Sequence, residues 1–257
     1  MSDRDGFTCP VCGFTSHNRI DVRDGYCGNC HDWTRPALTA DMKILLSGVV
    51  GSTAYGMARP DSDRDLLGVF AYPTRRFLSL QPPGDRYLTI QQHSPDVTWH
   101  EVRKFLLLCL DCNPTANELL WLEGYEHVGG YLAQSLVDNR QKFQARLRIK
   151  EAYYSYANQQ YRRLLSRGGA PELNEKLGRH MLRILHQGTH LYQTGQLRVR
   201  VDDPERYFDF GRKMLVDPTL AQPEFDRAFQ VFNEPSPLPE KADTDWVEDW
   251  LQYFRMS

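Results

Sequence analysis

The chain has 257 residues, of which 41% are hydrophobic and 25% are charged, and its formal net charge is −2. This balance is typical of a soluble globular protein with one large domain or two smaller ones, and it excludes a globally basic nucleic-acid coat. No apolar run approaches the length of a membrane span, and the first residues lack a secretory signal pattern. We therefore expect a cytoplasmic protein with no membrane partner.

The N-terminal segment carries two Cys-x-x-Cys pairs, which are Cys9 with Cys12 and Cys27 with Cys30. Fourteen residues separate the pairs, and this spacing is typical of four thiolates on one structural zinc ion. A segment this short has no hydrophobic core of its own, so metal binding would supply its folding energy. We predict a zinc ribbon over residues 1–35, with a disulfide or redox site as the alternative.

The next predicted element is a buried strand at residues 44–50, because this run is short and mostly apolar. It ends in Gly51 and Ser52. A glycine lets the backbone come close to a ligand, and a serine adds a hydroxyl and an N–H group. If residues 53–58 form a short helix, its N-terminal amides face the same place, which favours phosphate. The pattern predicts a triphosphate site made of Gly51, Ser52 and Thr53.

Two carboxylates follow a few residues later, because Asp63 and Asp65 precede a second apolar run at residues 66–70. Side chains two positions apart on a strand point to the same face, so both carboxylates converge on one spot. Oxygen ligands of this kind suit Mg²⁺, and two such ions about 4 Å apart clamp the attacking and leaving oxygens of an in-line displacement. The alternative is an ordinary turn and a polar loop, since Gly, Ser and Asp are common turn formers.

An alternating segment at residues 96–100 and a helix at residues 101–110 follow in the first half of the chain. A third Cys-x-x-Cys pair ends this helix but has no second pair nearby. We therefore predict that Cys109 lies in the core and Cys112 at the helix end, and that neither is a metal ligand. Pro114 suits the first turn of a further short helix.

The pattern changes to helices after about residue 130. Apolar residues at helical spacing predict helices at residues 148–166 and 172–194, each followed by glycine, and these would form an antiparallel pair. Residues 245–254 form a further amphipathic helix, with an aromatic stripe that we expect to pack in the core.

Charge is unevenly placed along this second half. Residues 140–167 hold eight basic residues against one acid, Glu151, whereas the segment after Pro235 is acidic. A basic surface that faces a polyanion and a solvated helix face are both consistent with this distribution.

Together these motifs resemble a known superfamily. Gly51-Ser52 with Tyr55-Gly56, Ser62-Asp63-Arg64-Asp65 and Gly68-Val69 are similar to the DNA polymerase β-like nucleotidyltransferases. The similarity is strongest to predicted nucleotidyltransferases associated with RNA repair, some of them from phages. It continues in Glu101 to Leu106, Asn113 to Trp121 and Arg179 to Gly195, and it covers roughly residues 42–200.

The resemblance implies an α+β fold in three parts. The zinc ribbon at residues 1–35 would come first, followed by a polymerase β-like mixed sheet with helices at residues 42–128, which would be the catalytic domain. A C-terminal α-helical domain would span residues 129–257.

The resemblance also implies roles for individual residues. Ser52 would contact the triphosphate, and Asp63 and Asp65 would bind Mg²⁺. The superfamily usually needs a third carboxylate on a later strand to activate the attacking hydroxyl, and Asp96 is the natural candidate. The alternatives for this carboxylate are Glu101 and Glu118.

Three residues of the predicted helical half, Arg179, His180 and Arg183, share roughly one helix face. A basic residue, a histidine and an arginine recur here in the resembling family, so Arg179 and Arg183 would contact the nucleotide. The alternative is a salt-bridged helix surface. Lys104 is a weaker candidate for a contact with the triphosphate.

The predicted function is metal-dependent transfer of NMP from an NTP to an acceptor hydroxyl, with release of pyrophosphate. The resemblance and the added zinc ribbon favour RNA as acceptor, either a tRNA or a damaged 3′ end. The cofactors would be two Mg²⁺ or Mn²⁺ ions and a structural Zn²⁺, and the ribbon would bind nucleic acid or a protein partner, or be purely structural. The alternatives are nucleotidylation of a protein or small molecule, and a non-catalytic nucleic-acid-binding adaptor. The compartment would be the host cytoplasm if a phage encodes the chain.

Overall fold

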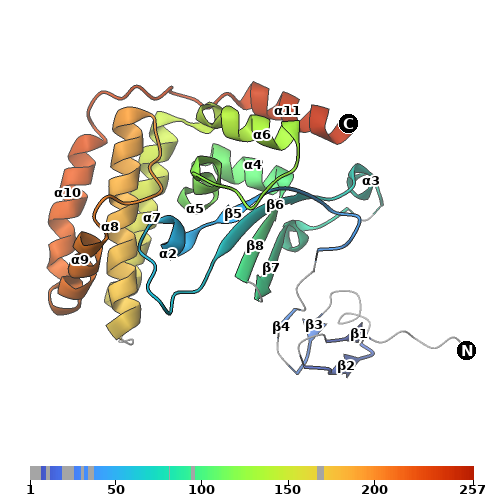
Figure 1. Ribbon diagram of the computed structural model, residues 1–257, viewed down its shortest axis with the longest axis horizontal. Coiled ribbons are helices and arrows are strands. Elements are labelled where there is room, and N and C mark those ends of the chain that lie inside the picture. The colour runs from blue at the N-terminus through green and yellow to red at the C-terminus, as the bar shows by residue number, and fades with distance from the viewer. Residues whose placement is uncertain are drawn as a thin grey trace, which may run out of the picture.

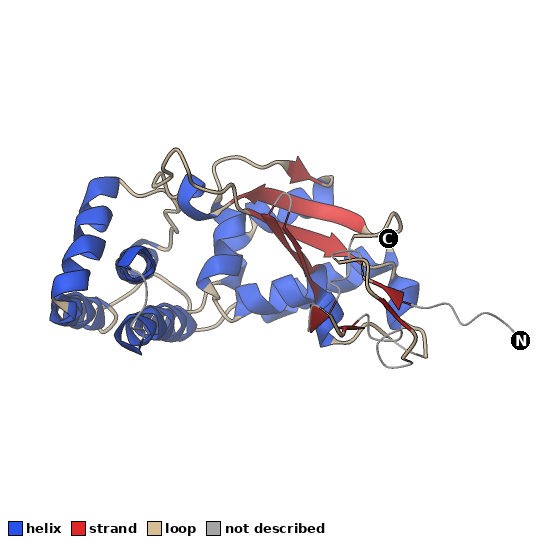
Figure 2. Cartoon of the chain, turned by 90° about the horizontal axis from the view of Figure 1, so that it is seen from below, coloured by secondary structure: helices blue, strands red, loops and turns tan. Residues whose placement is uncertain are grey.

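The fold centres on a mixed sheet of five strands. The computed structural model describes residues 7–9, 12–18, 26–29, 32–33, 38–80, 82–93, 96–166 and 171–257. The sheet lies toward one end of the molecule and several long helices lie at the other (Figure 1, Figure 2). Its order is β7-β8-β6-β5-β9. The strands are β5 (Lys43–Val49), β6 (Leu66–Ala71), β7 (Thr89–His93), β8 (Asp96–Glu101) and β9 (His127–Val128).

The apolar runs that predicted strands form the middle of this sheet. β5 and β6 pair antiparallel, and β6 pairs parallel with β8. The antiparallel pairs β7–β8 and β5–β9 complete the two edges. The sheet and the helices confirm the predicted α+β class.

Most of the chain after β8 is helical. The main helices are α4 (Val102–Leu110), α5 (Pro114–Asn117), α6 (Tyr131–Asp138), α7 (Arg146–Ser166), α8 (Pro171–Thr194), α9 (Pro204–Val216), α10 (Ala221–Val231) and α11 (Thr244–Met256). Two short helices, α2 (Gly51–Ala54) and α3 (Thr74–Phe77), follow β5 and β6. The helix expected at residues 53–58 therefore begins earlier, at Gly51, and ends after one turn.

The two faces of the sheet contribute to different clusters of buried residues. Leu67 and Val69 of β6 join the large core that includes the helices. Phe70, between Val69 and Ala71 on the opposite face, packs with Ile90 and Trp99 in a smaller cluster. This separation follows from the alternation of side chains along a strand.

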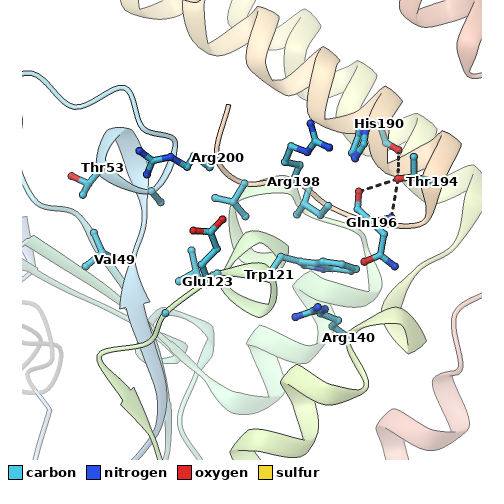
Figure 3. A pocket seen from close by; sticks show the side chains of 15 residues that line it. Val49, Thr53, Trp121, Glu123, Arg140, His190, Thr194, Gln196, Arg198 and Arg200 are labelled. Atoms are coloured by element: carbon cyan, nitrogen blue, oxygen red, sulfur yellow. Dashed lines mark hydrogen bonds between the residues drawn. The ribbon is translucent and has the colours of Figure 1, made fainter. Parts of the chain in front are cut away.

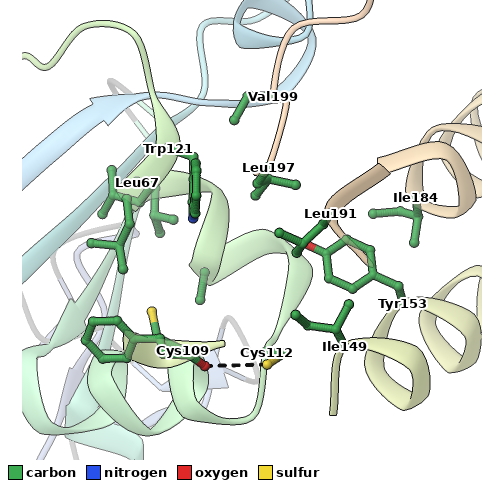
Figure 4. Packing of buried hydrophobic residues seen from close by; sticks show 14 of the residues in the cluster. Leu67, Cys109, Cys112, Trp121, Ile149, Tyr153, Ile184, Leu191, Leu197 and Val199 are labelled. Atoms are coloured by element: carbon green, nitrogen blue, oxygen red, sulfur yellow. Dashed lines mark hydrogen bonds between the residues drawn. The ribbon is translucent and has the colours of Figure 1, made fainter. Parts of the chain in front are cut away.

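The large core runs without a break from the sheet into the long helices. Figure 4 shows Leu67 of β6 in the same cluster as Trp121, Tyr153 of α7 and Leu191 of α8. Cys109 and Cys112 are fully buried there, as predicted for Cys109, and Cys112 follows the end of α4 with a positive φ of 52°. A single hydrophobic core therefore stabilises both the sheet and the helical half.

Helices α7 and α8 form the predicted antiparallel pair, and a glycine sets how closely they approach. A Cβ atom at Gly188 of α8 would lie 2.5 Å from the Cβ of Tyr153 on α7. Any larger residue would push the helices apart at this point. Since α8 carries basic residues on the side that faces α2, this spacing also helps to position the site described below.

Helix α11 returns to the sheet from far along the chain. Trp250 and Phe254 are buried and stacked, with ring centroids 5.4 Å apart, which agrees with the expected core stripe. Arg255 donates a hydrogen bond of 3.0 Å to the carbonyl of Tyr72 and forms an ion pair with the buried Glu101. The sheet therefore depends on a helix that is distant in sequence.

The described residues of the N-terminal unit include two pairs of short antiparallel strands. These are β1 (Phe7–Thr8) with β2 (Thr15–Ser16) and β3 (Tyr26–Cys27) with β4 (Asp32–Trp33). In the part of the chain that the structure describes, no helix combines the length and apolar character that crossing a bilayer requires.

Candidate active site

Gly51 and Asp65 meet at the end of the two central strands. The backbone of Gly51 has a positive φ of 68°, and a Cβ atom there would collide with the carboxylate of Asp65. The N–H of Val50 donates to the carbonyl of Asp65 at 2.9 Å. Gly51 is therefore required for two reasons, the left-handed backbone and the close approach of a carboxylate.

The parallel register of β6 and β8 brings the third predicted carboxylate to the same edge. Leu66 lies opposite Val97, so continuing this register by one residue places Asp65 opposite Asp96. Burial and then the charge of Asp96 raise the pKa of Asp65, and the charge of Asp63 adds to this effect. A carboxylate whose pKa is raised by the charges of neighbouring carboxylates belongs to a site that a cation stabilises.

The donor set fits Mg²⁺ in its chemistry, because it consists of carboxylate oxygens beside a predicted phosphate site. Asp63 is exposed and Asp65 is partly buried, so ions and phosphates reach both. Among the described residues, only the N-terminal cysteines form a group of three ligand atoms within 4.8 Å of one another. The carboxylate oxygens of Asp63, Asp65 and Asp96 therefore do not all lie within 4.8 Å of one another. Their spacing is wider than that of the ligands around a single bound metal ion.

A cavity of about 400 Å³ lies between α2 and the long helices. Gly51, Ser52 and Asp65 line one side of it. The other side carries side chains that bind anions or donate hydrogen bonds. These are Arg163 of α7 and Lys176, Arg179, His180 and Arg183 of α8. The structure therefore brings the predicted Gly-Ser element and the predicted helical residues to opposite walls of one cavity.

Arg183 is almost completely buried, with 1% of its surface exposed. Its guanidinium group lies 3.6 Å from the ring centroid of Tyr55, donates to Gln187 at 2.5 Å, and donates to Nδ1 of His180 at 2.9 Å. The carboxylate of Glu118 lies 3.7 Å away. These contacts hold the cation in one orientation at the cavity wall.

Glu118 completes this buried network. It accepts from the hydroxyl of Tyr55 at 2.9 and 3.0 Å. Burial raises the pKa of Glu118 to about 7, although Arg183 and the hydrogen bond from Tyr55 act in the opposite direction. Glu118 therefore orients Arg183 and Tyr55, and it is not one of the residues that line the cavity.

His180 is neutral in this arrangement. Burial, followed by the charge of Arg183, holds the pKa of His180 well below its usual range. Since Nδ1 accepts from Arg183, the remaining ring proton is on Nε2. His180 thus offers one N–H donor and carries no charge.

Arg179 is held more loosely than Arg183. It lies 4.6 Å over the ring of Phe208 and 3.7 Å from a carboxylate oxygen of Glu175. Its Nε is buried without a hydrogen-bond partner, and burial lowers its pKa. Arg179 lines the cavity, and an arginine in this position is suited to bind phosphate.

Several predicted site residues lie elsewhere. Lys104 donates to the hydroxyl of Thr89 at 2.6 Å and does not line the cavity, because α4 points it at strand β7. Thr53 lines a different cavity on the other side of α2 (Figure 3). Glu101 caps α4 by accepting from the N–H of Arg103 at 2.8 Å. It stands at the far end of β8 from Asp96, about 16 Å away for a strand of this length.

Sequence reasoning missed Lys176, Arg163 and the roles of Tyr55 and Glu118. Lys176 precedes Arg179 and His180 by three and four positions, so helical spacing was a usable signal for it. Arg163 belonged to the recognised basic run but was not assigned to the site. The Tyr55–Glu118 contact joins residues 63 positions apart, and no local pattern encodes it.

The predicted zinc ligands are close together in the N-terminal unit. The sulfurs of Cys9, Cys12 and Cys27 lie within 4.8 Å of one another, and those of Cys12 and Cys27 are 3.5 Å apart. A tight turn presents the first pair, since the N–H of Gly13 donates to the carbonyl of Cys9 at 2.9 Å. Three converging thiols suit zinc. The fourth predicted ligand, Cys30, lies outside the described residues.

Comparison with known proteins agrees with this geometry. The model of RlaP, the RNA repair pathway DNA polymerase beta family, matches residues 32–209. The chain belongs to this family. The match spans the sheet, the predicted carboxylates, and helices α7 and α8, so the family supports a nucleotidyltransferase in general. No curated protein matches the chain.

Proposed function

We propose that this protein transfers a nucleotidyl group from an NTP to a hydroxyl of RNA and releases pyrophosphate. One observation carries the proposal. The Gly51–Asp65 contact places a carboxylate on one wall of a cavity whose opposite wall holds Lys176, Arg179 and Arg183. The carboxylate of Asp65 and these cations face each other across a space of about 400 Å³, which is within the range of small-molecule sites. Asp63 and Asp96 lie beside Asp65 but do not line this cavity.

The donor would bind with its phosphates between these walls. Ser52 and the backbone amide of Gly51 would bind phosphate oxygens from the side of α2, as predicted. Lys176 and Arg179 would neutralise phosphate charge from α8. Arg183 is immobilised by its buried contacts, so it would act as a fixed positive charge in the wall.

In the transfer step, an acceptor oxygen attacks the α-phosphorus of the NTP. A new P–O bond forms, the bond between the α-phosphorus and the bridging oxygen breaks, and pyrophosphate leaves with that electron pair. Asp96 would accept the hydroxyl proton, directly or through water. Two Mg²⁺ ions held by Asp63, Asp65 and Asp96 would neutralise phosphate charge and favour the ionised hydroxyl.

RNA is the proposed acceptor because of the family to which the chain belongs, whose description names RNA repair. Nucleotidylation of a protein or a small molecule would use the same donor site. The test is therefore a transfer assay with α-labelled ATP, CTP, GTP and UTP and three acceptors, which are RNA, DNA and protein. We expect Mg²⁺-dependent label on RNA together with released pyrophosphate.

The control variant is Asp61→Asn, because Asp61 is exposed and lies two residues before the predicted carboxylates. Label that persists when Asp63 and Asp65 are both replaced by Asn would contradict the proposal, and so would label on protein alone.

We further propose that the N-terminal unit binds one structural Zn²⁺ through Cys9, Cys12, Cys27 and Cys30. The convergence of three of these sulfurs supports this. Metal analysis of the purified protein should give about one equivalent of zinc, and Cys9→Ser with Cys12→Ser should remove it. Less than half an equivalent in the unmodified protein, purified without chelator, would exclude the site.

A further inference from the structure

A second cavity lies on the other side of α2 from the donor site. Its volume is about 600 Å³. Val49, Thr53 and Ala54 line it near β5 and α2, and the segment that follows α8 lines it from the opposite side (Figure 3). One turn of helix therefore separates two cavities, since Gly51 and Ser52 line the donor site and Thr53 lines this one.

This second cavity is rich in positive charge. Arg140, Arg198 and Arg200 line it, against a single carboxylate from Glu123. Arg198 pairs with Asp202 at 2.6 Å, but both side chains are more than half exposed. Such a pair is weak and exchanges readily for a phosphate contact. The cavity is therefore suited to an anion.

Arg140 also provides a flat surface. Its guanidinium group lies 4.3 Å from the ring centroid of Trp121, and its Nη1 donates to the carbonyl of Leu120 at 3.4 Å. Trp121 covers one face of the guanidinium plane, and both side chains line the cavity. Unpaired RNA bases stack on arginine planes supported in this way.

The cavity continues into a neighbouring one of about 470 Å³. Thr194 and Gln196 line both, so the two cavities lie next to each other along the same segment. Lys142, Lys241 and Asp243 line the second part, where Lys142 pairs with Asp243 at 2.6 Å and Lys241 adds the net positive charge. We call the whole the arginine groove, after Arg140, Arg198 and Arg200. An extended basic groove fits a strand of several nucleotides better than a single mononucleotide.

One wall of the groove is linked to the segment that carries the predicted carboxylates. Glu123 and Gly124 line the groove. Two residues further on, Glu126 pairs at 2.5 Å with Arg64, which lies between Asp63 and Asp65. A short loop of the protein therefore joins the wall of the groove to the segment that carries Asp63 and Asp65.

We propose that the arginine groove binds the single-stranded 3′ region of the acceptor RNA, with phosphates on Arg198 and Arg200 and a base stacked on Arg140. This inference rests on the proposed function for its choice of ligand. It assigns donor and acceptor to opposite sides of α2, so that one helical turn contacts both substrates.

The test measures binding of a fluorescent 12-nucleotide single-stranded RNA to the full-length protein by anisotropy. Arg140→Ala with Arg198→Ala should weaken binding by at least about tenfold. It should also lower the slope of log affinity against log salt by about 0.7, which is the value for the one phosphate contact that Arg198 makes with a single strand. Binding of Mg²⁺–NTP, measured separately by calorimetry, should change by less than about twofold.

The matched control is Arg148→Ala with Arg212→Ala, which removes two exposed, ion-paired arginines outside both cavities. Arg198→Glu reverses one charge at an exposed side chain and guards against loss of folding in the double variant. RNA affinity equal to that of the control in both groove variants would overturn the inference.

The outcomes separate this inference from the proposed function. RNA binding that depends on the groove, without NTP-dependent label on RNA, supports the groove and contradicts nucleotidyl transfer to RNA. If the amount of label on RNA is unchanged in both groove variants, nucleotidyl transfer to RNA is supported and the assignment of the groove is contradicted.

Discussion

The cavity lined by Gly51, Ser52 and Asp65, which we call the donor cavity, and the arginine groove share α2. The two sites hold their arginines in different ways. Arg183 in the donor cavity is buried and touches Tyr55, Gln187, His180 and Glu118. In the groove, the side chain of Arg198 is 55% exposed and has one exposed ion pair. Fixed charge suits a donor whose triphosphate is always the same shape, whereas mobile charge suits an acceptor whose bases vary.

The largest expected effect tests whether nucleotidyl transfer depends on Asp63 and Asp65 while RNA binding does not. Asp63→Asn with Asp65→Asn should lower nucleotidyl transfer by about 10³-fold or more, because the phosphate charge loses its metal ligands. The affinity for single-stranded RNA should stay within about twofold of the parent protein. Asp61→Asn serves as the control for both measurements. A parallel loss of RNA binding would mean that the two sides of α2 do not act separately.

The next effect contrasts a buried arginine with an exposed one. Arg183→Met leaves Glu118 buried without its cation, and we expect the free energy of unfolding to fall by about 3–5 kcal/mol. Arg198→Met should change it by no more than about 0.5 kcal/mol. Urea denaturation followed by circular dichroism measures both. Similar values for the two variants would remove the distinction between fixed and mobile charge.

A third prediction uses pH to test the buried network. The pKa of Glu118 is raised to about 7 in the folded protein from a usual value of 4.5, so the folded state keeps a proton that the unfolded state has lost between these values. The free energy of unfolding should therefore fall as pH rises from about 4.5 to about 7, by up to about 3 kcal/mol from this residue.

Glu118→Gln should remove that part of the pH dependence, because glutamine does not titrate. Glu123→Gln, at an exposed carboxylate that lines the arginine groove, should leave it intact. An unchanged pH profile in Glu118→Gln would mean that the carboxylate titrates normally despite its burial.

The smallest effect concerns donor affinity. Arg179→Ala should raise the KM for NTP by about 10- to 100-fold, as expected for loss of one charged hydrogen-bond donor to phosphate. It should leave RNA affinity unchanged. Arg212→Ala, on α9, is the matched control, since that arginine pairs with Asp209 on the surface. Equal KM values in the two variants would place the triphosphate away from Arg179.

Local patterns predicted the central strands and the longest helices, and they supplied the candidate residues of the site, but they did not predict α9 or α10. A short apolar run that ends in Gly-Ser predicted β5, and apolar spacing with terminal glycines predicted α7 and α8. The pair Asp63 and Asp65 stood out because two carboxylates so close together have a specific use. Each of these signals lies within a few residues of sequence.

The contacts that complete the site were beyond such reasoning, because they join distant positions. The collision that keeps position 51 a glycine involves Asp65, which directly precedes the next strand, and local sequence offered Glu118 only as an alternative third carboxylate. The basic residues between positions 140 and 167 include examples of both interpretations, a solvated helix face and a surface that faces an anion. Lys142 and Arg146 pair with Asp243 and Glu240 of the acidic segment, whereas Arg140 and Arg163 line cavities.

The ion pair between Glu101 and Arg255 affects when the sheet can complete its folding during translation. Its two members are 154 residues apart, so a nascent chain that has emerged as far as α8 already carries all three predicted carboxylates. At that stage Arg255 has not yet been synthesised, so Glu101, which is fully buried in the complete fold, lacks the cation with which it pairs. Catalytic competence should therefore appear late in synthesis, after α11 has emerged, and a chain stopped before residue 244 should expose this edge to chaperones and proteases.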